Sequence, residues 1–186
     1  MQDEAPDEQL MLAYQGGDAG AFQALYTRHK GPLYRFMQRS VREHGLVEEL
    51  YQDVWMRVIE SRARYAPTAK FTTWLYTIAH NRMMDHFRRH SLRAVDASED
   101  AQALGEAMPA RSGEQPENVA ETRADLRRLA EAIAALPHAQ REVFLMHEES
   151  GMTVAEIAEA TGEGVEATKS RLRYALQKLR EALRDD

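Results

Sequence analysis

The sequence predicts an all-α protein made of two small helical domains joined by a flexible linker. Apolar residues recur at helical spacing through residues 9–90 and again through residues 121–186. Between these stretches, residues 91–120 are rich in Ser, Asp, Glu, Gly and Pro and poor in large apolar residues. We therefore expect a first domain at 1–90, a linker at 91–120 and a second domain at 121–186.

In the first domain, apolar stripes at helical spacing begin at Leu10, Phe22 and Val47, and a last helix is predicted to begin at about Thr72. The pair Gly31-Pro32 fits either a kink inside the second helix or a new helix start. A loop is expected at residues 65–69, ahead of a last helix that runs to about Arg89. A short helix between Asp100 and Ala107 is compatible with the linker sequence.

Composition excludes several classes of protein. The chain has no cysteine, which rules out disulfides and thiolate metal sites. It has no apolar run of membrane-spanning length, and its acidic N-terminus lacks the features of a secretory signal. The simplest interpretation is a cytoplasmic protein, and nothing in the sequence calls for a cofactor or a metal.

The net charge of −6 is unusual for a protein that binds DNA, but the charges are segregated. Residues 43–60 carry five acids and one base, and residues 61–90 carry six bases and one acid. Residues 142–163 carry six acids and no Lys or Arg, and residues 165–184 carry six bases and two acids. The repeated pattern predicts two basic surfaces for phosphates, each beside a surface for something else; solvated helix faces are the alternative.

The strongest local signal is a helix-turn-helix between residues 153 and 172. Thr153 is a natural N-cap, and Glu156 completes a capping box three residues later. Gly162 and Gly164 supply a tight turn before a long second helix.

That second helix has the side chains that a helix in the DNA major groove needs. Polar side chains lie opposite its apolar stripe, and cations flank them on both sides, which suits base edges and phosphates respectively. The alternative is an amphipathic surface helix in a bundle. The candidate DNA-binding residues are Glu166, Lys169, Ser170, Arg171, Arg173, Tyr174, Gln177 and Lys178.

Residues 71–89 form a helix with apolar and aromatic residues all round it and arginines among them. Rings interleaved with cations suit unpaired bases, which stack on the rings while phosphates meet the arginines. Core packing is the favoured alternative for Trp74, Leu75, Ile78 and Phe87, whereas nucleic-acid binding is favoured for the polar residues. The candidates in this region are Arg64, Lys70, Trp74, Asn81, Arg82, Asp85, Arg88 and Arg89.

Several motifs occur together, in a fixed order. They are Glu48–Val58 (EELYQDVWMRV), Trp74–Asn81 (WLYTIAHN), Ile133–Pro137 (IAALP), Arg141–Phe144 (REVF) and the helix-turn-helix. The first two resemble region two of the extracytoplasmic-function (ECF) sigma factors of bacterial RNA polymerase, and the others resemble region four of that family. The resemblance covers nearly the whole chain apart from the linker and the extreme N-terminus.

The resemblance implies a transcription initiation factor that binds core RNA polymerase, recognises promoter DNA, promotes strand opening and serves a stress- or signal-responsive gene set. It implies that the acidic helix docks on a coiled coil of the polymerase's largest subunit through Glu48, Glu49, Gln52, Asp53, Trp55 and Met56. Core packing is an equal alternative for Trp55 and Met56. The loop from Arg64 to Lys70 and the helix after it would hold the melted minus-ten element. Asp85 is equally compatible with a structural partnership with a nearby arginine.

The second helix of the helix-turn-helix would read the minus-thirty-five element, with Arg171 and Lys178 on phosphates. Two positions depart from the family pattern: His80 and Tyr174 stand where many relatives have a basic residue. Many relatives are held inactive by an anti-sigma partner, so such a partner is expected here.

Geometry agrees with two separate DNA contacts. The two promoter elements are more than a helical turn, ~35 Å, apart, and a linker of about 30 residues reaches up to ~100 Å when extended. The acidic balance suggests that the free protein binds DNA poorly and that polymerase supplies the missing affinity.

Two rival functions remain open at this point. A stand-alone helix-turn-helix regulator would bind DNA independently, usually as a dimer. A metal-dependent enzyme would have to use His86 and His90, with His80 and Asp85 nearby, but neighbouring arginines would repel a cation there.

Overall fold

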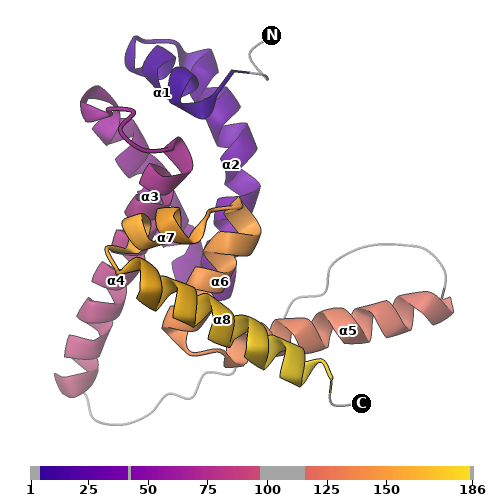
Figure 1. Cartoon of the computed structure of the whole chain (residues 1–186). Helices are drawn as coiled ribbons and strands as arrows, with labels where there is room; N and C mark the ends of the chain where they lie inside the picture. The colour runs from indigo at the N-terminus through magenta and orange to yellow at the C-terminus, as the bar shows by residue number, and fades with distance from the viewer. Residues whose placement is uncertain (1–4, 42, 97–115, 185–186) are drawn as a thin grey trace.

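The computed structural model describes residues 5–41, 43–96 and 116–184 of the protein. Within these ranges the chain forms α-helices and one 3-10 turn, with no strand, so the predicted all-α class is confirmed (Figure 1). The elements are α1 (Asp7–Gln15), α2 (Ala19–Ser40), α3 (His44–Ser61), η1 (Arg62–Arg64), α4 (Phe71–Asp96), α5 (Pro116–Ala135), α6 (His138–Ser150), α7 (Val154–Thr161) and α8 (Val165–Ala182).

Local sequence explains where α2 begins, and packing explains why it continues through a proline. The Asp18 carboxylate accepts hydrogen bonds from the backbone N–H groups of Gly20 and Ala21 and so caps the helix. The helix then runs unbroken past Pro32, although the proline removes one backbone hydrogen bond. The buried side chains of Leu33 and Phe36 follow at once, and their burial holds the helix together across this position.

The N-terminus of α4 is held by a hydrogen bond to a side chain of α1. The backbone N–H of Phe71 donates to the carboxylate of Glu8 in α1 over 2.7 Å. Helix α4 then runs to Asp96, seven residues beyond its predicted end at Arg89. Because α5 begins at Pro116, the two helices together occupy both ends of the segment 91–120 that the sequence predicts to be linker. The short helix considered at Asp100–Ala107 lies outside the described residues.

The second domain follows the sequence signals closely. Pro137 lies between α5 and α6, at the N-cap position of α6. Helix α7 begins directly after the predicted N-cap Thr153 and ends directly before the predicted turn at Gly162. It has the predicted capping box, in which Thr153 and Glu156 bond each other's backbone N–H. Gly162 ends α7 in the left-handed conformation, with a φ of 70°, which a residue without a Cβ adopts readily.

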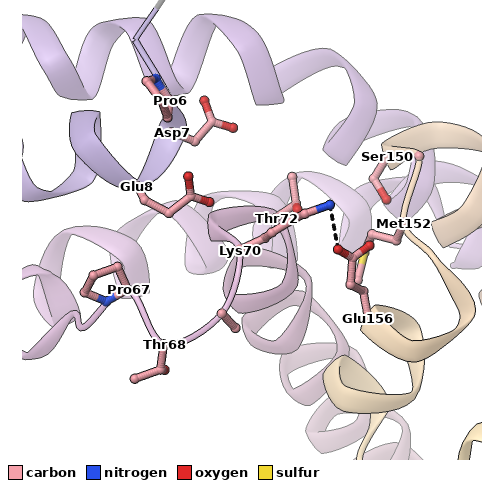
Figure 2. A pocket seen from close by; sticks show the side chains of 12 residues that line it. Pro6, Asp7, Glu8, Pro67, Thr68, Lys70, Thr72, Ser150, Met152 and Glu156 are labelled. Carbon is pink, nitrogen blue, oxygen red and sulfur yellow. Dashed lines mark ion pairs between the residues drawn. The ribbon is translucent and has the colours of Figure 1, made fainter.

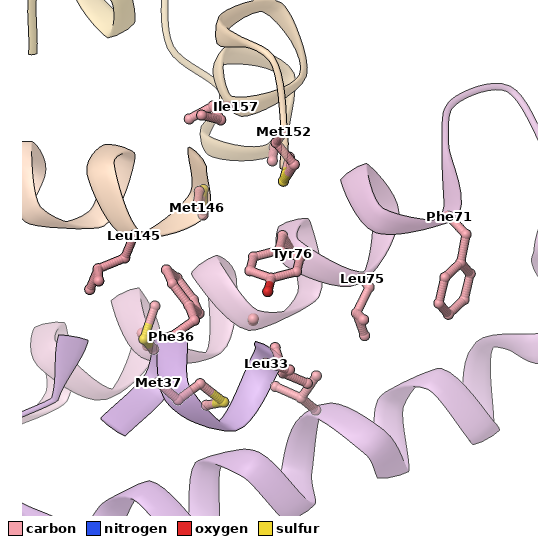
Figure 3. Close-up of a cluster of buried hydrophobic side chains, with 14 of the residues drawn as sticks. Leu33, Phe36, Met37, Phe71, Leu75, Tyr76, Leu145, Met146, Met152 and Ile157 are labelled. Carbon is pink, nitrogen blue, oxygen red and sulfur yellow. The ribbon is translucent and has the colours of Figure 1, made fainter. Parts of the chain in front are cut away.

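The two domains pack against each other and share one core. Helix α6 lies against α2, and α7 lies against α4 (Figure 1). Figure 3 shows side chains from four helices and the loop before α7 meeting in this core. The residues labelled there are Leu33, Phe36 and Met37 of α2, Phe71, Leu75 and Tyr76 of α4, Leu145 and Met146 of α6, Met152 and Ile157. The helix-turn-helix is thus held directly against α4, the helix that carries most of the candidate residues for the minus-ten element.

Candidate nucleic-acid interface

Helix α3 divides its candidate polymerase-binding residues between surface and core. Glu48, Glu49 and Gln52 are exposed and Asp53 is half-buried. Met56 is 53% exposed, whereas Trp55 is only 6% exposed. The indole of Trp55 packs edge-on against the ring of Tyr26, with centroids 4.9 Å apart. Burial therefore favours the core-packing alternative for Trp55 and leaves Met56 as the apolar residue of an otherwise acidic surface.

The loop ahead of α4 is fixed by side chains from the domain beneath it. The Gln15 amide donates to the carbonyl oxygens of Ala63 and Tyr65. Tyr65 is buried, and burial together with the nearby Glu8 carboxylate raises its pKa to about 12. Its ring lies edge-on to Trp74, with centroids 5.0 Å apart. These contacts hold Arg64 and Lys70, at the two ends of the loop, exposed to solvent.

Along α4 the candidate residues differ in exposure. Asn81, Arg88 and Arg89 are exposed, and Arg82 and Asp85 are half-buried. Trp74 is also half-buried and packs on the core, as the core-packing alternative predicted for it.

Polar contacts within α4 bear on Asp85 and Arg82. The Asp85 carboxylate lies 3.8 Å from the guanidinium of Arg88, and its backbone carbonyl accepts a hydrogen bond from Arg89. Asp85 thus has the structural partner that was one of its two alternatives. The Nε atom of Arg82 is buried without a hydrogen-bond partner.

Helix α8 exposes its polar face and buries the middle of its apolar stripe. Thr168, Leu172, Ala175 and Leu179 are buried against the rest of the domain. Val165 and Leu183, at the two ends of the predicted stripe, are exposed. Six candidate residues are exposed, namely Glu166, Lys169, Arg173, Tyr174, Gln177 and Lys178, and Ser170 and Arg171 are half-buried.

Three contacts order the polar face of α8. The guanidinium of Arg171 forms an ion pair with Glu163 in the turn before the helix. The guanidinium of Arg173 lies over the ring of Tyr174, 5.0 Å from its centroid. Gln177 donates a hydrogen bond to Glu181. The result is a single face of donors, acceptors and cations that is exposed in the described part of the chain, as a groove-binding helix requires.

Lys70 has a partner that the sequence did not indicate. Its ammonium lies 2.7 Å from the carboxylate of Glu156 in α7, at the side of an open cavity of about 650 Å³ (Figure 2). The hydrogen bond to Glu156 raises the pKa of Lys70. In turn, hydrogen bonds from Lys70 and from the backbone N–H of Thr153 lower the pKa of Glu156. The pair joins a candidate DNA-binding residue of one domain to the capping residue of the other.

The acidic block at residues 142–163 supplies contacts between the two domains, which its sequence did not indicate. Glu142 and Glu149 face the first domain, as Glu156 does, and form ion pairs with it. Their partners are His80 of α4 and two arginines of α2, Arg35 and Arg39. Arg35 and Arg39 belong to none of the four charged blocks, so the charge of the blocks did not indicate which residues meet.

The described part of the chain contains no helix long and apolar enough to cross a membrane. It also contains no group of three or more His, Asp or Glu residues arranged to hold a metal ion. His80, considered in the metal-enzyme alternative, is hydrogen-bonded to Glu142.

Both domains match known families. The family described as Sigma-70 region 2 matches residues 25–93, and the family described as Sigma-70, region 4 matches residues 126–179. The RNA polymerase sigma factor CarQ of Myxococcus xanthus is 33% identical over 93% of this chain and 95% of its own length. The ECF RNA polymerase sigma factor SigK of Mycobacterium sp. (strain KMS) is 30% identical over 89% of this chain and 84% of its own length.

Two solved structures share the fold. The sigma factor RpoE of Bartonella quintana, in complex with the anti-sigma factor NepR, superposes with a TM-score of 0.75 and 23% identity, covering 89% of this chain and 98% of RpoE. CnrH, in complex with the cytosolic domain of CnrY, superposes with a TM-score of 0.68 and 23% identity, covering 97% of this chain and 98% of CnrH.

The matches to regions two and four, in that order, coincide with the two helical domains. The similarity to CarQ and SigK extends over nearly the full length of each chain. This protein therefore belongs to the ECF group of the sigma-70 family and is an RNA polymerase sigma factor.

Proposed function

We propose that this sigma factor joins core RNA polymerase through the exposed acidic face of α3 and directs it to a specific set of promoters through two DNA contacts. The single observation that carries the proposal is the exposed polar face of α8, built on a capped and tightly turned helix-turn-helix. We propose that the protein has one domain at residues 1–90 and another at residues 121–186, with residues 91–120 as the connecting segment.

The minus-thirty-five element is read by α8. Lys169, Ser170, Arg173 and Tyr174 contact base edges, with Lys169 at one flank of the polar face that carries the other three. Arg171 and Lys178 bind phosphates from its margin. Glu166 and Gln177 complete the polar surface.

The minus-ten element is melted and held by α4 and the loop before it. A base of the non-template strand leaves the stack, which costs a few kcal/mol. Asn81, Arg88 and Arg89, exposed along one side of α4, bind the single strand. Arg64 and Lys70 bind phosphates at the loop. Arg82 and Asp85, which are half-buried on α4, complete the surface of that helix. Trp74 supports this surface from the core side.

Polymerase docking uses Glu48, Glu49, Gln52 and Asp53 of α3 for electrostatic complementarity, with Met56 as the apolar contact. Trp55 holds α3 in place from the core.

We propose that the protein has no enzymatic activity of its own and acts in the cytoplasm, where polymerase and promoter DNA are found. An anti-sigma partner controls it in response to a signal. This part of the proposal is supported by the fold that the chain shares with the sigma factor RpoE, solved in complex with the anti-sigma factor NepR, and with CnrH, solved in complex with the cytosolic domain of CnrY.

The test is transcription from a pooled promoter library by purified core polymerase with and without the protein. New start sites that share two upstream elements are the expected result. The absence of both new transcripts and binding to core polymerase would overturn the proposal and favour a stand-alone regulator.

Single-site variants then separate the surfaces. Met56→Ala should weaken binding to core polymerase, and Arg173→Ala should lower transcription without affecting that binding. Arg127→Ala is the matched control, because Arg127 is an exposed arginine of α5 that pairs only loosely, at 3.9 Å, with Glu131. An equal loss in all three variants would show a general defect and would count against the proposed roles.

A further inference from the structure

Helix α1 holds the loop at residues 65–70 at both of its ends. At the start of the loop, the amide of Gln15 donates hydrogen bonds to the carbonyl oxygens of Ala63 and Tyr65, over 3.1 and 3.3 Å. At its end, the carboxylate of Glu8 accepts the backbone N–H of Phe71 over 2.7 Å. These bonds join residues 48, 50 and 63 positions apart, so one helix distant in sequence fixes both ends of the loop.

A further contact joins α1 to η1, the turn that leads into the loop. The guanidinium of Arg62 lies over the ring of Tyr14, 5.2 Å from its centroid, and donates to the Tyr14 hydroxyl over 3.4 Å. Tyr14 is only 7% exposed, so the core fixes its ring. Two neighbouring residues in the last turn of α1, Tyr14 and Gln15, thus hold the chain where it enters the loop.

Helix α1 is itself fastened to the domain. The carboxylate of Asp7, its first residue, lies 2.7 Å from the guanidinium of Arg28 and 2.7 Å from the imidazole of His29, both in α2. The side chains of Leu10 and Met11 are buried in the core. Because α1 is anchored by polar and apolar contacts, it can impose a defined position on the loop that it contacts.

The side of the loop away from α1 is open. Residues 66–68 are exposed. Figure 2 shows Glu8 on one side of the loop and the side chain of Thr68 pointing away from it. Arg64 and Lys70, the proposed phosphate-binding residues, are exposed as well. Helix α1 therefore supports the loop from behind and leaves its outer surface accessible to DNA.

The loop depends on this support for its orientation. The backbone N–H of Thr68 donates to the carbonyl oxygen of Ala66 over 2.8 Å, which closes a tight turn. That bond shapes the turn, but it does not orient the turn relative to α4. The bonds from Gln15 and Glu8 do so, because they fix the chain immediately before and after the turn. Orientation matters for recognition, since hydrogen bonds to a base weaken steeply when their geometry is poor.

We propose that Gln15 and Glu8 are positioning residues for recognition of the minus-ten element. They orient the loop and so set its base preference, without touching DNA. The inference rests on the proposed function, in which this loop helps to hold the melted strand. Helix α1 precedes residues 25–93, which match Sigma-70 region 2, so that match assigns no role to it.

The test is transcription by the polymerase holoenzyme from a promoter library that varies only in the minus-ten element. Gln15→Met keeps the length of the side chain and removes its N–H donors, which leaves the carbonyl of the buried Tyr65 without this partner. A single mismatched base pair commonly lowers affinity by about 5- to 150-fold, and discrimination between the preferred minus-ten sequence and its single-base variants should fall about tenfold in Gln15→Met. The matched control is Gln9→Met, since Gln9 is exposed on the same helix.

Conservative changes at both residues should preserve the preference. Gln15→Lys restores an N–H donor toward the two carbonyl oxygens and should recover most of the discrimination. Glu8→Gln keeps an oxygen that can accept the N–H of Phe71, whereas Glu8→Ala does not, so only the latter should lose discrimination. Preference for minus-thirty-five sequences, measured with a second library, should stay unchanged in every variant.

A variant of the core separates positioning from stability. Leu10→Val shortens a buried side chain of the same helix and lowers the thermal midpoint, but it removes no polar contact with the loop. It should keep the minus-ten discrimination of the wild type. An equal loss of discrimination in Leu10→Val and Gln15→Met would overturn the inference, because the effect would then follow general loosening of the domain.

The outcomes also separate this inference from the proposed function. If the wild-type holoenzyme selects promoters and Gln15→Met discriminates equally well, the positioning role fails and the sigma function stands. If the wild-type holoenzyme shows no promoter-specific transcription, the proposed function fails and this inference fails with it.

Discussion

The imidazole of His80 lies 2.7 Å from the carboxylate of Glu142, across the boundary between α4 and α6. The two side chains are 14% and 6% exposed, so water screens neither of them well. The structure thus gives His80 a contact between the two domains. A histidine at this position suits a partner that is buried rather than a phosphate in solvent.

We predict that the two partners respond differently to truncation. His80→Ala leaves the Glu142 carboxylate buried without its partner and should lower the free energy of unfolding by about 1–3 kcal/mol. Glu142→Ala leaves an imidazole without its partner, which costs less to bury than an unpartnered carboxylate, so this change should lower the free energy of unfolding by less. Urea unfolding of the single and double variants measures both effects. Equal costs for the two single changes would show that the pair matters only through packing.

A second prediction concerns the start of α4. Glu8 accepts the backbone N–H of Phe71 at 2.7 Å, so Glu8→Ala removes a cap that comes from outside the helix. The expected cost is about 1 kcal/mol of unfolding free energy, which is typical for loss of an N-cap. Gln9→Ala is the control, since Gln9 is the exposed neighbour on the same helix. The two variants should differ in thermal midpoint, and matching midpoints would mean that Glu8 contributes nothing as a cap.

Elements with local signals could be predicted from the sequence, whereas the relation between the domains could not. Helix α7 matches its predicted bounds because Thr153, Glu156 and Gly162 act within a few residues of one another. The run of α2 through Pro32 depends on burial of Leu33 and Phe36 against distant segments, which no local rule specifies.

The candidate site shows the same division. Helical spacing was enough to assign an exposed face to α8, because its inward stripe is regular. It could not separate Trp55 from Met56, since neighbouring residues on α3 differ in burial only through the helices packed beside them. The pairing of Lys70 with Glu156 joins residues 86 positions apart, and only the folded chain shows it.

A third prediction concerns pH. Burial lowers the pKa of His138, and the charges of Arg141 and His80 act in the same direction, against that of Glu142. An unfolded histidine titrates near pH 6.5, so below about that value the unfolded chain holds more protons than the folded one. The contribution of His138 to stability is therefore present above about pH 6.5 and is lost as the pH falls through the folded pKa.

The variant His138→Gln should reduce the loss of unfolding free energy between about pH 7 and pH 5.5. Denaturant unfolding of the wild type and the variant at both pH values provides the measurement. An identical loss in the two proteins would show that His138 takes no part in the pH dependence.

The last prediction separates base reading from phosphate binding on α8. Arg171 is half-buried beside Glu163, at the margin of the exposed face, whereas Arg173 is exposed over the ring of Tyr174. Arg171→Ala should weaken promoter binding by the polymerase holoenzyme equally for all minus-thirty-five sequences, and should reduce the salt slope by about one. Arg173→Ala should cost about 1–3 kcal/mol on the preferred sequence and relax the preference at one base pair.

The measurement is binding to a library of minus-thirty-five sequences at several salt concentrations. Because Arg171→Ala also deprives Glu163 of its partner, Glu163→Gln is the control, and it should leave the salt slope nearly unchanged. A changed sequence preference in Arg171→Ala, with none in Arg173→Ala, would exchange the two roles. It would mean that α8 enters the groove rotated toward the side that carries Arg171, with Arg173 turned to the DNA backbone.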